Sequence, residues 1–228
     1  MSARLGHPRL HLRRTDSTNE RARALAAAGA PHGALVTAAE QTAGRGRQGR
    51  GWSTPPGSAI ALSLVIRDPD PLLSLRAGLA VADLAGAGAR VKWPNDVLLD
   101  GRKVAGVLVE GRPQAGWAVL GIGVNAALDL ELLPEELRGV AGTLGLAPRE
   151  LPRALDELLR ALEARLSEPG DATLAALRER DALAGRPLRW EGGAGTGAGI
   201  AADGALLVRR ADGSLHQLAA GEVHLGGA

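Results

Sequence analysis

Segment 44–52, with the sequence GRGRQGRGW, constrains the fold more than any other part of the chain. Its glycines weaken helices and strands, and its arginines are rarely buried without a partner. The flanking segments 34–39 and 58–66 are largely apolar, which is typical of buried strands. The sequence therefore predicts a long loop at 40–57, held between two buried strands.

This loop has the charge of an anion-binding segment. No acidic residue lies between Glu40 and Asp68, whereas Arg45, Arg47 and Arg50 all fall inside the loop. Arginine offers forked donors that suit carboxylate and phosphate oxygens. We interpret the loop as a mobile lid that closes over an anionic ligand and excludes water. The alternative is a solvated arginine–glycine loop that binds RNA, although such tracts usually repeat and this one does not.

The same glycines match a dinucleotide fingerprint only in their spacing. Gly44, Gly46 and Gly49 satisfy G-x-G-x-x-G after a predicted strand. That fingerprint also requires a helix to open at the last glycine. Pro55 and Pro56 follow closely and prevent such a helix. The sequence therefore argues against a Rossmann nucleotide site.

Apolar spacing and helix breakers predict the other elements. A serine at position 17 and a glutamate at position 20 match a capping box, so we expect a helix to begin there. The expected elements are a strand at 9–14, a helix from Ser17 to about Ala28, a helix from Pro71 to about Ala87, a hairpin of 97–99 with 103–110, a strand at 117–124 and two amphipathic helices within 148–183.

The chain changes character after Gly185. Helical spacing ends there, and short apolar segments alternate with glycine clusters as far as residue 225. Asp203-Gly204 and Asp212-Gly213 are typical of tight hairpin turns. This pattern predicts a small β-barrel. We expect a mixed α/β domain at 1–184 and a small β domain at 185–228.

Composition excludes several classes of protein. The chain has no cysteine, which excludes disulfides, cysteine zinc sites and thiol nucleophiles. A formal net charge of +2 is too small to favour nucleic acid as a partner. The N-terminal segment lacks the apolar core of a signal peptide, and no apolar run is long enough to span a membrane. These features predict a cytoplasmic protein without a membrane partner.

Lysine is rare in this chain: of 27 basic residues, only Lys92 and Lys103 are lysines. Both lie in segment 91–110, VKWPNDVLLDGRKVAGVLVE, which contains a turn signal at Asp100-Gly101. One interpretation is a plain hairpin with Lys103 at its solvent-exposed end and Lys92 beside a turn. The other is a ligand site in which a strand carries a cation beside Gly106, because glycine inside a strand often marks a close approach.

Segment 117–124 leaves the same two interpretations open. It is apolar apart from Gly121 and Gly123, and glycines weaken a strand unless something packs closely against them. Packing between protein layers and the wall of a ligand site explain them equally well.

Five stretches, in this order, resemble the motifs of the biotin protein ligase family. They are S-T-N at 17–19, a segment at 41–52 that we call the arginine loop, K-W-P-N-D at 92–96, K-V-A-G-V-L-V-E at 103–110 and G-I-G-V-N at 121–125. Each motif alone is weak, but five in order across nearly the whole chain are specific. The departures are mild: Gln48 stands where the family often has arginine, and Ala126 replaces a bulkier apolar residue.

The resemblance implies an α+β fold, in which a mixed-sheet catalytic domain similar to class II synthetases precedes a small SH3-like barrel. It implies an enzyme that uses ATP and Mg²⁺ to activate biotin as biotinoyl-5′-AMP. The biotinoyl group then passes to a lysine of a biotin carboxyl carrier protein, a subunit of acetyl-CoA carboxylase. Because the family's first strand starts near Arg9 here, we expect the monofunctional type, which binds no DNA. A homodimer is compatible with the resemblance.

The resemblance also implies roles for individual residues. The expected catalytic residues are Lys103, Arg47 and Arg45. The residues expected to bind biotin are Ser17, Thr18, Asn19, Gln41, Gly44, Arg45, Gly46, Arg47, Lys103, Gly106 and Gly121. The residues expected to bind ATP or the adenylate are Arg47, Arg50, Trp52, Lys92, Asn95, Asp96, Lys103 and Asn125. No residue is expected to form a dedicated metal site.

Two other functions compete with this one. A lipoate ligase or octanoyltransferase has a related fold but lacks the G-R-G-R-x-G-R loop. A nucleic-acid-binding module could use the arginine loop, yet the chain has no Phe or Tyr on which bases could stack. Biotin ligation is therefore the function that the sequence favours.

Overall fold

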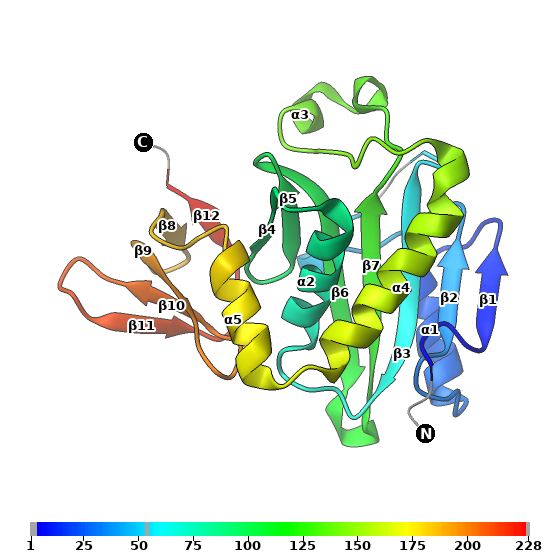
Figure 1. Cartoon of the computed structure of the whole chain (residues 1–228), viewed down its shortest axis with the longest axis horizontal. Coiled ribbons are helices and arrows are strands. Elements are labelled where there is room, and N and C mark those ends of the chain that lie inside the picture. Colours follow the sequence, from blue (N-terminus) through cyan, green and yellow to red (C-terminus); the bar gives the residue numbers. More distant parts are fainter. Residues whose placement is uncertain (1–3, 53–54, 227–228) are drawn as a thin grey trace.

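A seven-stranded mixed sheet lies at the centre of the computed structural model, which describes residues 4–52 and 55–226 (Figure 1). The strand order is β1-β2-β3-β7-β6-β5-β4. β1 pairs with β2 in parallel, and the other neighbouring strands pair antiparallel. The strands are β1 (Arg9–Leu12), β2 (Leu35–Ala38), β3 (Ala59–Arg67), β4 (Ala89–Lys92), β5 (Asp96–Leu99), β6 (Arg102–Arg112) and β7 (Trp117–Asn125).

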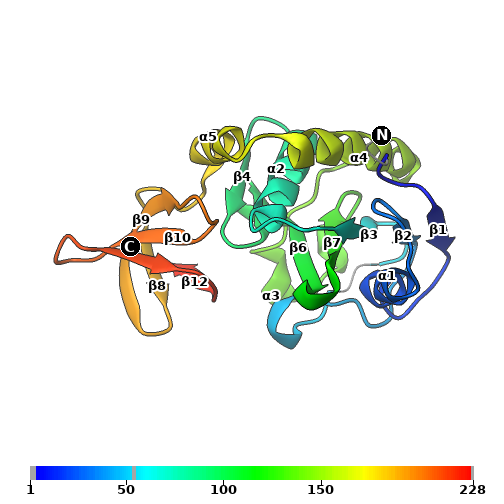
Figure 2. The ribbon, with the colours of Figure 1, turned by 90° about the horizontal axis from the view of Figure 1, so that it is seen from below.

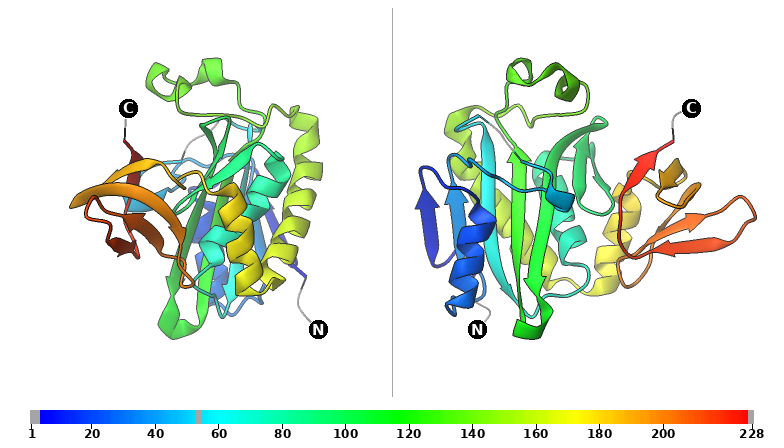
Figure 3. Two further views of the ribbon diagram at one scale, coloured as in Figure 1. Left: turned by 60° about the vertical axis from the view of Figure 1, so that its left-hand side comes forward. Right: turned by 180° about the vertical axis from the view of Figure 1, so that it is seen from behind.

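Helices cover both faces of this sheet (Figures 2 and 3). On one face, α1 packs through Ala22 and Ala26 against Val36 and Val65. On the other face, α2 and α4 lie over the larger apolar core. The helices are α1 (Thr18–Ala27), α2 (Leu73–Ala85), α3 (Glu135–Arg138), α4 (Leu151–Ser167) and α5 (Gly170–Arg180). Single 3-10 turns lie at Arg47–Gly49, Pro113–Ala115, Leu130–Leu132 and Pro148–Glu150.

Strand β3 illustrates how the sequence assigns side chains to the two faces. Because side chains alternate along a strand, Leu62, Leu64 and Ile66 join the core under α2 and α4. Val65 faces α1, and Ser63 shares that face and is fully buried. The sheet therefore carries a buried hydroxyl beneath the start of α1.

The C-terminal segment forms a five-stranded antiparallel sheet of order β11-β10-β9-β8-β12. Its strands are β8 (Pro187–Trp190), β9 (Gly193–Ile200), β10 (Leu206–Arg209), β11 (Leu215–Leu218) and β12 (Val223–Leu225). The two predicted turns are confirmed, with φ of 85° at Gly204 and 84° at Gly213. The predicted α+β fold with a small β unit is therefore confirmed, while the boundary at 184/185 stays a prediction.

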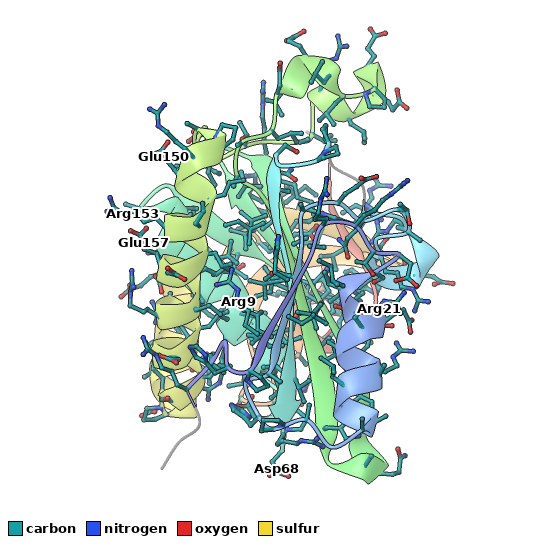
Figure 4. All side chains as sticks on the ribbon, turned by 90° about the vertical axis from the view of Figure 1, so that its right-hand side faces the viewer. Arg9, Arg21, Asp68, Glu150, Arg153 and Glu157 are labelled. Carbon is teal, nitrogen blue, oxygen red and sulfur yellow. The ribbon has the colours of Figure 1, made fainter. Side chains whose placement is uncertain are left out.

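The predicted pair of C-terminal helices is also confirmed. α4 ends at Ser167 and α5 begins at Gly170, so the break falls at Glu168 and Pro169. On the outer face of α4, the exposed side chains of Arg153 and Glu157 form an ion pair of 2.8 Å (Figure 4). The opposite face of α4 is buried in the core.

The predicted capping box at Ser17 is wrong. Ser17 occupies the N-cap position with extended φ and ψ of −152° and 133°, but its side chain makes no capping hydrogen bond. Glu20 instead pairs with Arg45 of the arginine loop at 2.5 Å. The start of α1 therefore directs a charged side chain toward the loop.

The predicted hairpin turn at Asp100-Gly101 is confirmed. Asp100 and Gly101 have φ of 50° and 77° and join β5 to β6, because positive φ at both positions suits a tight hairpin. Lys92 ends β4 and Lys103 lies on β6, so β5 separates them.

Among the helices of the described residues, none combines the length and the apolar character that a membrane span requires.

Candidate active site

A cavity of about 140 Å³ opens between the start of α1, the arginine loop and strands β6 and β7. Each of the five stretches that resemble family motifs contributes to its wall. The lining residues are Ser17, Thr18, Asn19, Gln41, Arg45, Gly46, Arg47, Arg50, Gly51, Trp52, Leu62, Asn95, Lys103, Gly106, Val107, Leu108, Gly121, Ile122 and Gly123.

Neutral polar groups gather where α1 meets β3. The Thr18 backbone N–H and hydroxyl lie 2.8 Å and 3.0 Å from Gln41 Oε1. Ser63 Oγ lies 2.8 Å from Thr18 Oγ1 and 2.6 Å from Asn19 Oδ1. We call Thr18, Asn19, Gln41 and Ser63 the polar cluster. Its amide oxygens and hydroxyls can bind a neutral ligand that carries N–H groups.

Glycines of β6 and β7 make room for side chains from other elements. Gly106 and Gly123 are partners across the two strands, and both contact the Trp52 indole. A Cβ on Gly121 would overlap the side-chain amide of Asn19. These glycines therefore admit Trp52 and Asn19 to the cavity wall, in agreement with a close approach of other groups to the strands.

Lys103 lies beside Trp52 and pairs with Asp96. Its Nζ lies 2.6 Å from Asp96 Oδ1 and 5.7 Å from the centre of the Trp52 ring. Its backbone N–H donates to Val140 O at 2.8 Å, and its carbonyl accepts from Gly142 N–H at 2.8 Å. These bonds fix the backbone of Lys103, and the residue lines the cavity.

Arg45 is neutralised by carboxylates at the mouth of the cavity. Its Nη1 lies 2.5 Å from Glu20 Oε1 and 3.7 Å from Glu110 Oε1. Arg23 also reaches Glu110, at 2.7 Å, so Glu110 bridges α1 and the loop. Arg45 is therefore tied to α1 in this state and would have to exchange partners to bind a ligand.

The other two arginines of the loop face the C-terminal sheet. Arg47 Nη2 donates to Gly221 O at 3.3 Å, and Arg50 forms an ion pair with Glu222. Both arginines also line the cavity. The C-terminal unit thus holds the outer side of the loop.

Four of the predicted site residues do not line the cavity: Gly44, Lys92, Asp96 and Asn125. Asp96 contacts the cavity indirectly, through Lys103. Asn125 is buried and donates to Gly142 O at 3.0 Å, which supports the segment beside Lys103. Gly44 O accepts from Trp52 N–H at 2.8 Å and so closes the base of the arginine loop. Lys92 lies at the end of β4, opposite Asp96.

Sequence reasoning missed several residues of the site. The missed residues are Gly51, Leu62, Ser63, Val107, Leu108, Glu110, Ile122 and Glu222. Ser63 carried a signal, because it interrupts the apolar stretch 59–66. Glu222 carried none, since a single glutamate near a chain end is ordinary.

An acidic group stays charged at the entrance to α1. The pKa of Asp16 lies below its ordinary value, because the Ser17 backbone N–H and the Thr15 hydroxyl donate to its carboxylate at 2.8 Å and 2.9 Å.

Within the part of the chain that the structure describes, no group of three or more His, Asp or Glu side chains is placed to hold a metal ion.

A protein-family model, the biotin/lipoate A/B protein ligase family, matches residues 11–126. This range covers half of the chain and includes every residue that lines the cavity. The chain belongs to this family. The membership agrees with the order of the five motif-like stretches along the sequence.

Curated relatives in the family are ligases. The chain is 42% identical over 170 residues to the biotin–[acetyl-CoA-carboxylase] ligase of Mycobacterium tuberculosis, which covers 67% of this chain and 61% of that protein. It is 38% identical over 146 residues to the bifunctional ligase/repressor BirA of Bacillus spizizenii, covering 59% of this chain and 45% of that protein. The chain thus spans about half the length of the curated relatives it matches.

Solved structures of the family share the fold over nearly the whole chain. The biotin protein ligase of Aquifex aeolicus, in complex with biotin and ATP, is 25% identical with a TM-score of 0.79, over 96% of this chain and 100% of that one. The Leishmania major enzyme, in complex with biotinyl-5-AMP, is 25% identical with a TM-score of 0.61, over 93% of this chain and 98% of that one. The fold is that of the biotin protein ligases.

Proposed function

We propose that this chain is an ATP-dependent ligase that activates biotin as biotinoyl-5′-AMP. It then transfers the biotinoyl group to a lysine of a biotin carboxyl carrier protein. The observation that carries the proposal is one cavity lined both by Thr18, Asn19 and Gln41 of the polar cluster and by Lys103 with the loop arginines. A ligand with a neutral N–H-bearing head and a carboxylate tail, as biotin has, matches these two kinds of group.

The two kinds of group lie at successive positions along β7. Asn19 of the polar cluster packs on Gly121, whereas Trp52, beside Lys103, packs on Gly123. Two residues of an extended strand span about 7 Å. A ligand lying along β7 can therefore place its head at the polar cluster and its carboxylate near the cations.

In the first step, a biotin carboxylate oxygen attacks the α-phosphate of ATP, and the bond to pyrophosphate breaks. Two anions must approach each other, so cations have to be in place before the reaction. A preorganised donor at such a site is worth about 3 kcal/mol of barrier. We assign that role to the ammonium of Lys103 and to the guanidinium of Arg47, both of which line the cavity.

We expect Mg²⁺ to enter the site together with the nucleotide. The described residues offer no ready carboxylate cluster, and Asp96 is committed to Lys103. Mg²⁺ usually keeps several waters and binds through substrate phosphates. When bound there, it would neutralise part of the phosphate charge.

In the second step, a lysine amine of the carrier attacks the carbonyl carbon of the mixed anhydride, and AMP leaves. Water would hydrolyse this anhydride, so the intermediate needs a cover. We assign that cover to the arginine loop, whose base is closed by Gly44 and Trp52 and whose outer side is held by Glu222. The names of the curated relatives support a carboxylase carrier as the acceptor.

Pyrophosphate release tests the first step directly. The purified protein with Mg-ATP is expected to release pyrophosphate only when biotin is added, and to retain a bound adenylate visible by mass spectrometry. Release that depends on lipoate rather than biotin would support the other branch of the family. No release with either acid would contradict the proposal.

A further inference from the structure

Ser63 is a polar residue at a position where packing alone would call for an apolar one. It interrupts the apolar stretch 59–66 of β3 and is 0% exposed. Val65, two residues on, shares its face against α1 and is also 0% exposed. A buried hydroxyl costs free energy unless it makes hydrogen bonds. The partners of Ser63 therefore indicate what the hydroxyl is for.

Three oxygen–oxygen contacts join the polar cluster. Thr18 Oγ1 lies 3.0 Å from Gln41 Oε1, and Ser63 Oγ lies 2.8 Å from Thr18 Oγ1 and 2.6 Å from Asn19 Oδ1. The amide oxygens of Asn19 and Gln41 only accept hydrogen bonds. Two hydroxyl hydrogens therefore serve three contacts, and their direction decides what the cluster offers to a ligand.

Other bonds fix the direction of these hydrogens. Asn19 Nδ2 donates to Glu110 Oε2 at 2.8 Å, so Oδ1 is the atom that faces Ser63. Gln41 Oε1 already accepts from the Thr18 backbone N–H at 2.8 Å, whereas Asn19 Oδ1 has Ser63 as its donor within the described residues. Ser63 therefore donates to Asn19, and the hydroxyl hydrogen of Thr18 is shared between Gln41 Oε1 and Ser63 Oγ, which lie 3.0 Å and 2.8 Å from Thr18 Oγ1.

This arrangement uses both hydroxyl hydrogens inside the protein. The remaining lone pairs of Thr18, Asn19 and Gln41, which all line the cavity, can then only accept. A cyclic urea brings N–H donors to such a wall. A dithiolane ring or an alkyl chain brings none and would leave buried acceptors unpaired, which is costly.

We propose that Ser63 is a positioning residue that orients Thr18 and Asn19 as acceptors and so favours ligands whose head carries N–H donors. The inference rests on the proposed function, because it concerns the head of the same ligand. Ser63 acts through its neighbours and does not itself line the cavity. Its effect belongs to ligand binding and not to the chemical step.

The test is calorimetry of the full chain with biotin and with an analogue methylated at a ureido nitrogen. Ser63→Ala is expected to weaken biotin binding about fivefold, the usual effect of one hydrogen bond. Methylation is expected to weaken binding to the wild type more than to Ser63→Ala. In steady-state adenylation, the variant should raise the KM for biotin and leave kcat within about twofold.

Val65→Ala is the matched control, because it removes buried volume from the same face without touching the polar cluster. It is expected to lower the Tm while leaving biotin affinity within about twofold. Ser63→Cys, a weaker donor of similar size, should fall between wild type and Ser63→Ala and tests the inference if the alanine variant does not fold.

The results that would contradict the proposed function differ from those that would contradict the role of Ser63. A wild-type chain that binds no biotin contradicts the proposed function itself. A wild type that binds biotin with an affinity shared by Ser63→Ala, or an equal loss on methylation in both proteins, overturns the role of Ser63 alone. A loss of affinity in Val65→Ala as large as in Ser63→Ala would likewise reduce Ser63 to a packing residue.

Discussion

A Cβ atom on Gly123 would lie 2.5 Å from Cε2 of Trp52, so the indole fills the space of the missing side chain. Gly106, the partner of Gly123 on β6, lies beneath the same ring, and a Cβ atom there would lie 3.2 Å from Cζ3 of Trp52. Trp52 also ends the arginine loop and lies 5.7 Å from the ammonium of Lys103. The glycine pair thus sets the position of the loop relative to the lysine.

Replacing Gly123 by alanine should therefore displace Trp52 and, with it, the loop. We expect kcat/KM for adenylation to fall at least about tenfold, which corresponds to about 1.4 kcal/mol. The Tm should change little, because alanine suits a strand better than glycine. Gly139→Ala is the control, since Gly139 has an ordinary φ of −77° and nothing within 4 Å of its Cβ position. Equal kinetics in the two variants would contradict the role of Gly123.

Lys103→Ala should lower the rate of adenylate formation by about 100-fold or more, because it removes a preorganised cation. The fold should persist, since the side chain is partly exposed and the backbone of Lys103 keeps its bonds to Val140 and Gly142. Single-turnover adenylation and a thermal melt measure the two effects. Lys103→Arg keeps the charge and separates charge from shape. A wild-type rate in the alanine variant would refute the catalytic role.

Glu222→Gln should loosen the arginine loop without much loss of stability. Its partner Arg50 is exposed, and a surface ion pair contributes about 0–1 kcal/mol. We expect trypsin to cleave the variant faster within the loop, with cleavage sites identified by mass spectrometry and the Tm almost unchanged. Glu131→Gln is the control, because Glu131 forms an exposed ion pair with Arg138, far from the loop in sequence. Identical cleavage in both variants would contradict the role of Glu222 in holding the arginine loop.

Asp181→Asn should stabilise the protein more at pH 7 than at pH 4. Burial raises the pKa of Asp181 in the folded state, although the N–H groups of Leu183 and Ala184 oppose the shift. A raised carboxyl pKa makes a contribution to stability that is full below the ordinary pKa and is lost as pH rises through the folded value. Asparagine avoids this loss and can still accept from Leu183 N–H. Urea unfolding at the two pH values measures the difference, and a pH-independent difference would contradict it.

Local sequence patterns predicted most helices, strands and turns, because neighbouring residues decide where such elements begin and end. Asp100-Gly101 forms a hairpin since both residues accept positive φ, and the break between α4 and α5 falls at Pro169. The capping-box prediction was wrong because Glu20 instead pairs with Arg45, a residue distant from it in the sequence. The placement of Lys92 on β4 and Lys103 on β6, with β5 between them, was not predicted, because strand order in a sheet does not follow from local sequence.

The site was predictable only where residues cluster in motifs. Ser63 meets Asn19 across 44 positions, and Arg50 meets Glu222 across 172 positions, so neither contact follows from local spacing. Such pairs form only once the sheet order places β3 against α1 and the C-terminal unit beside the loop. The motifs predicted most residues near the cavity, and the topology decided which of them line it.

The most direct measurement of the central claim is the intact mass of a biotin carboxyl carrier domain after incubation with this protein, biotin and Mg-ATP. The account predicts a gain equal to one biotinoyl group on the carrier lysine, absent when ATP is omitted and strongly reduced with Lys103→Ala. A carrier of unchanged mass, or one modified by lipoate in preference to biotin, would contradict it.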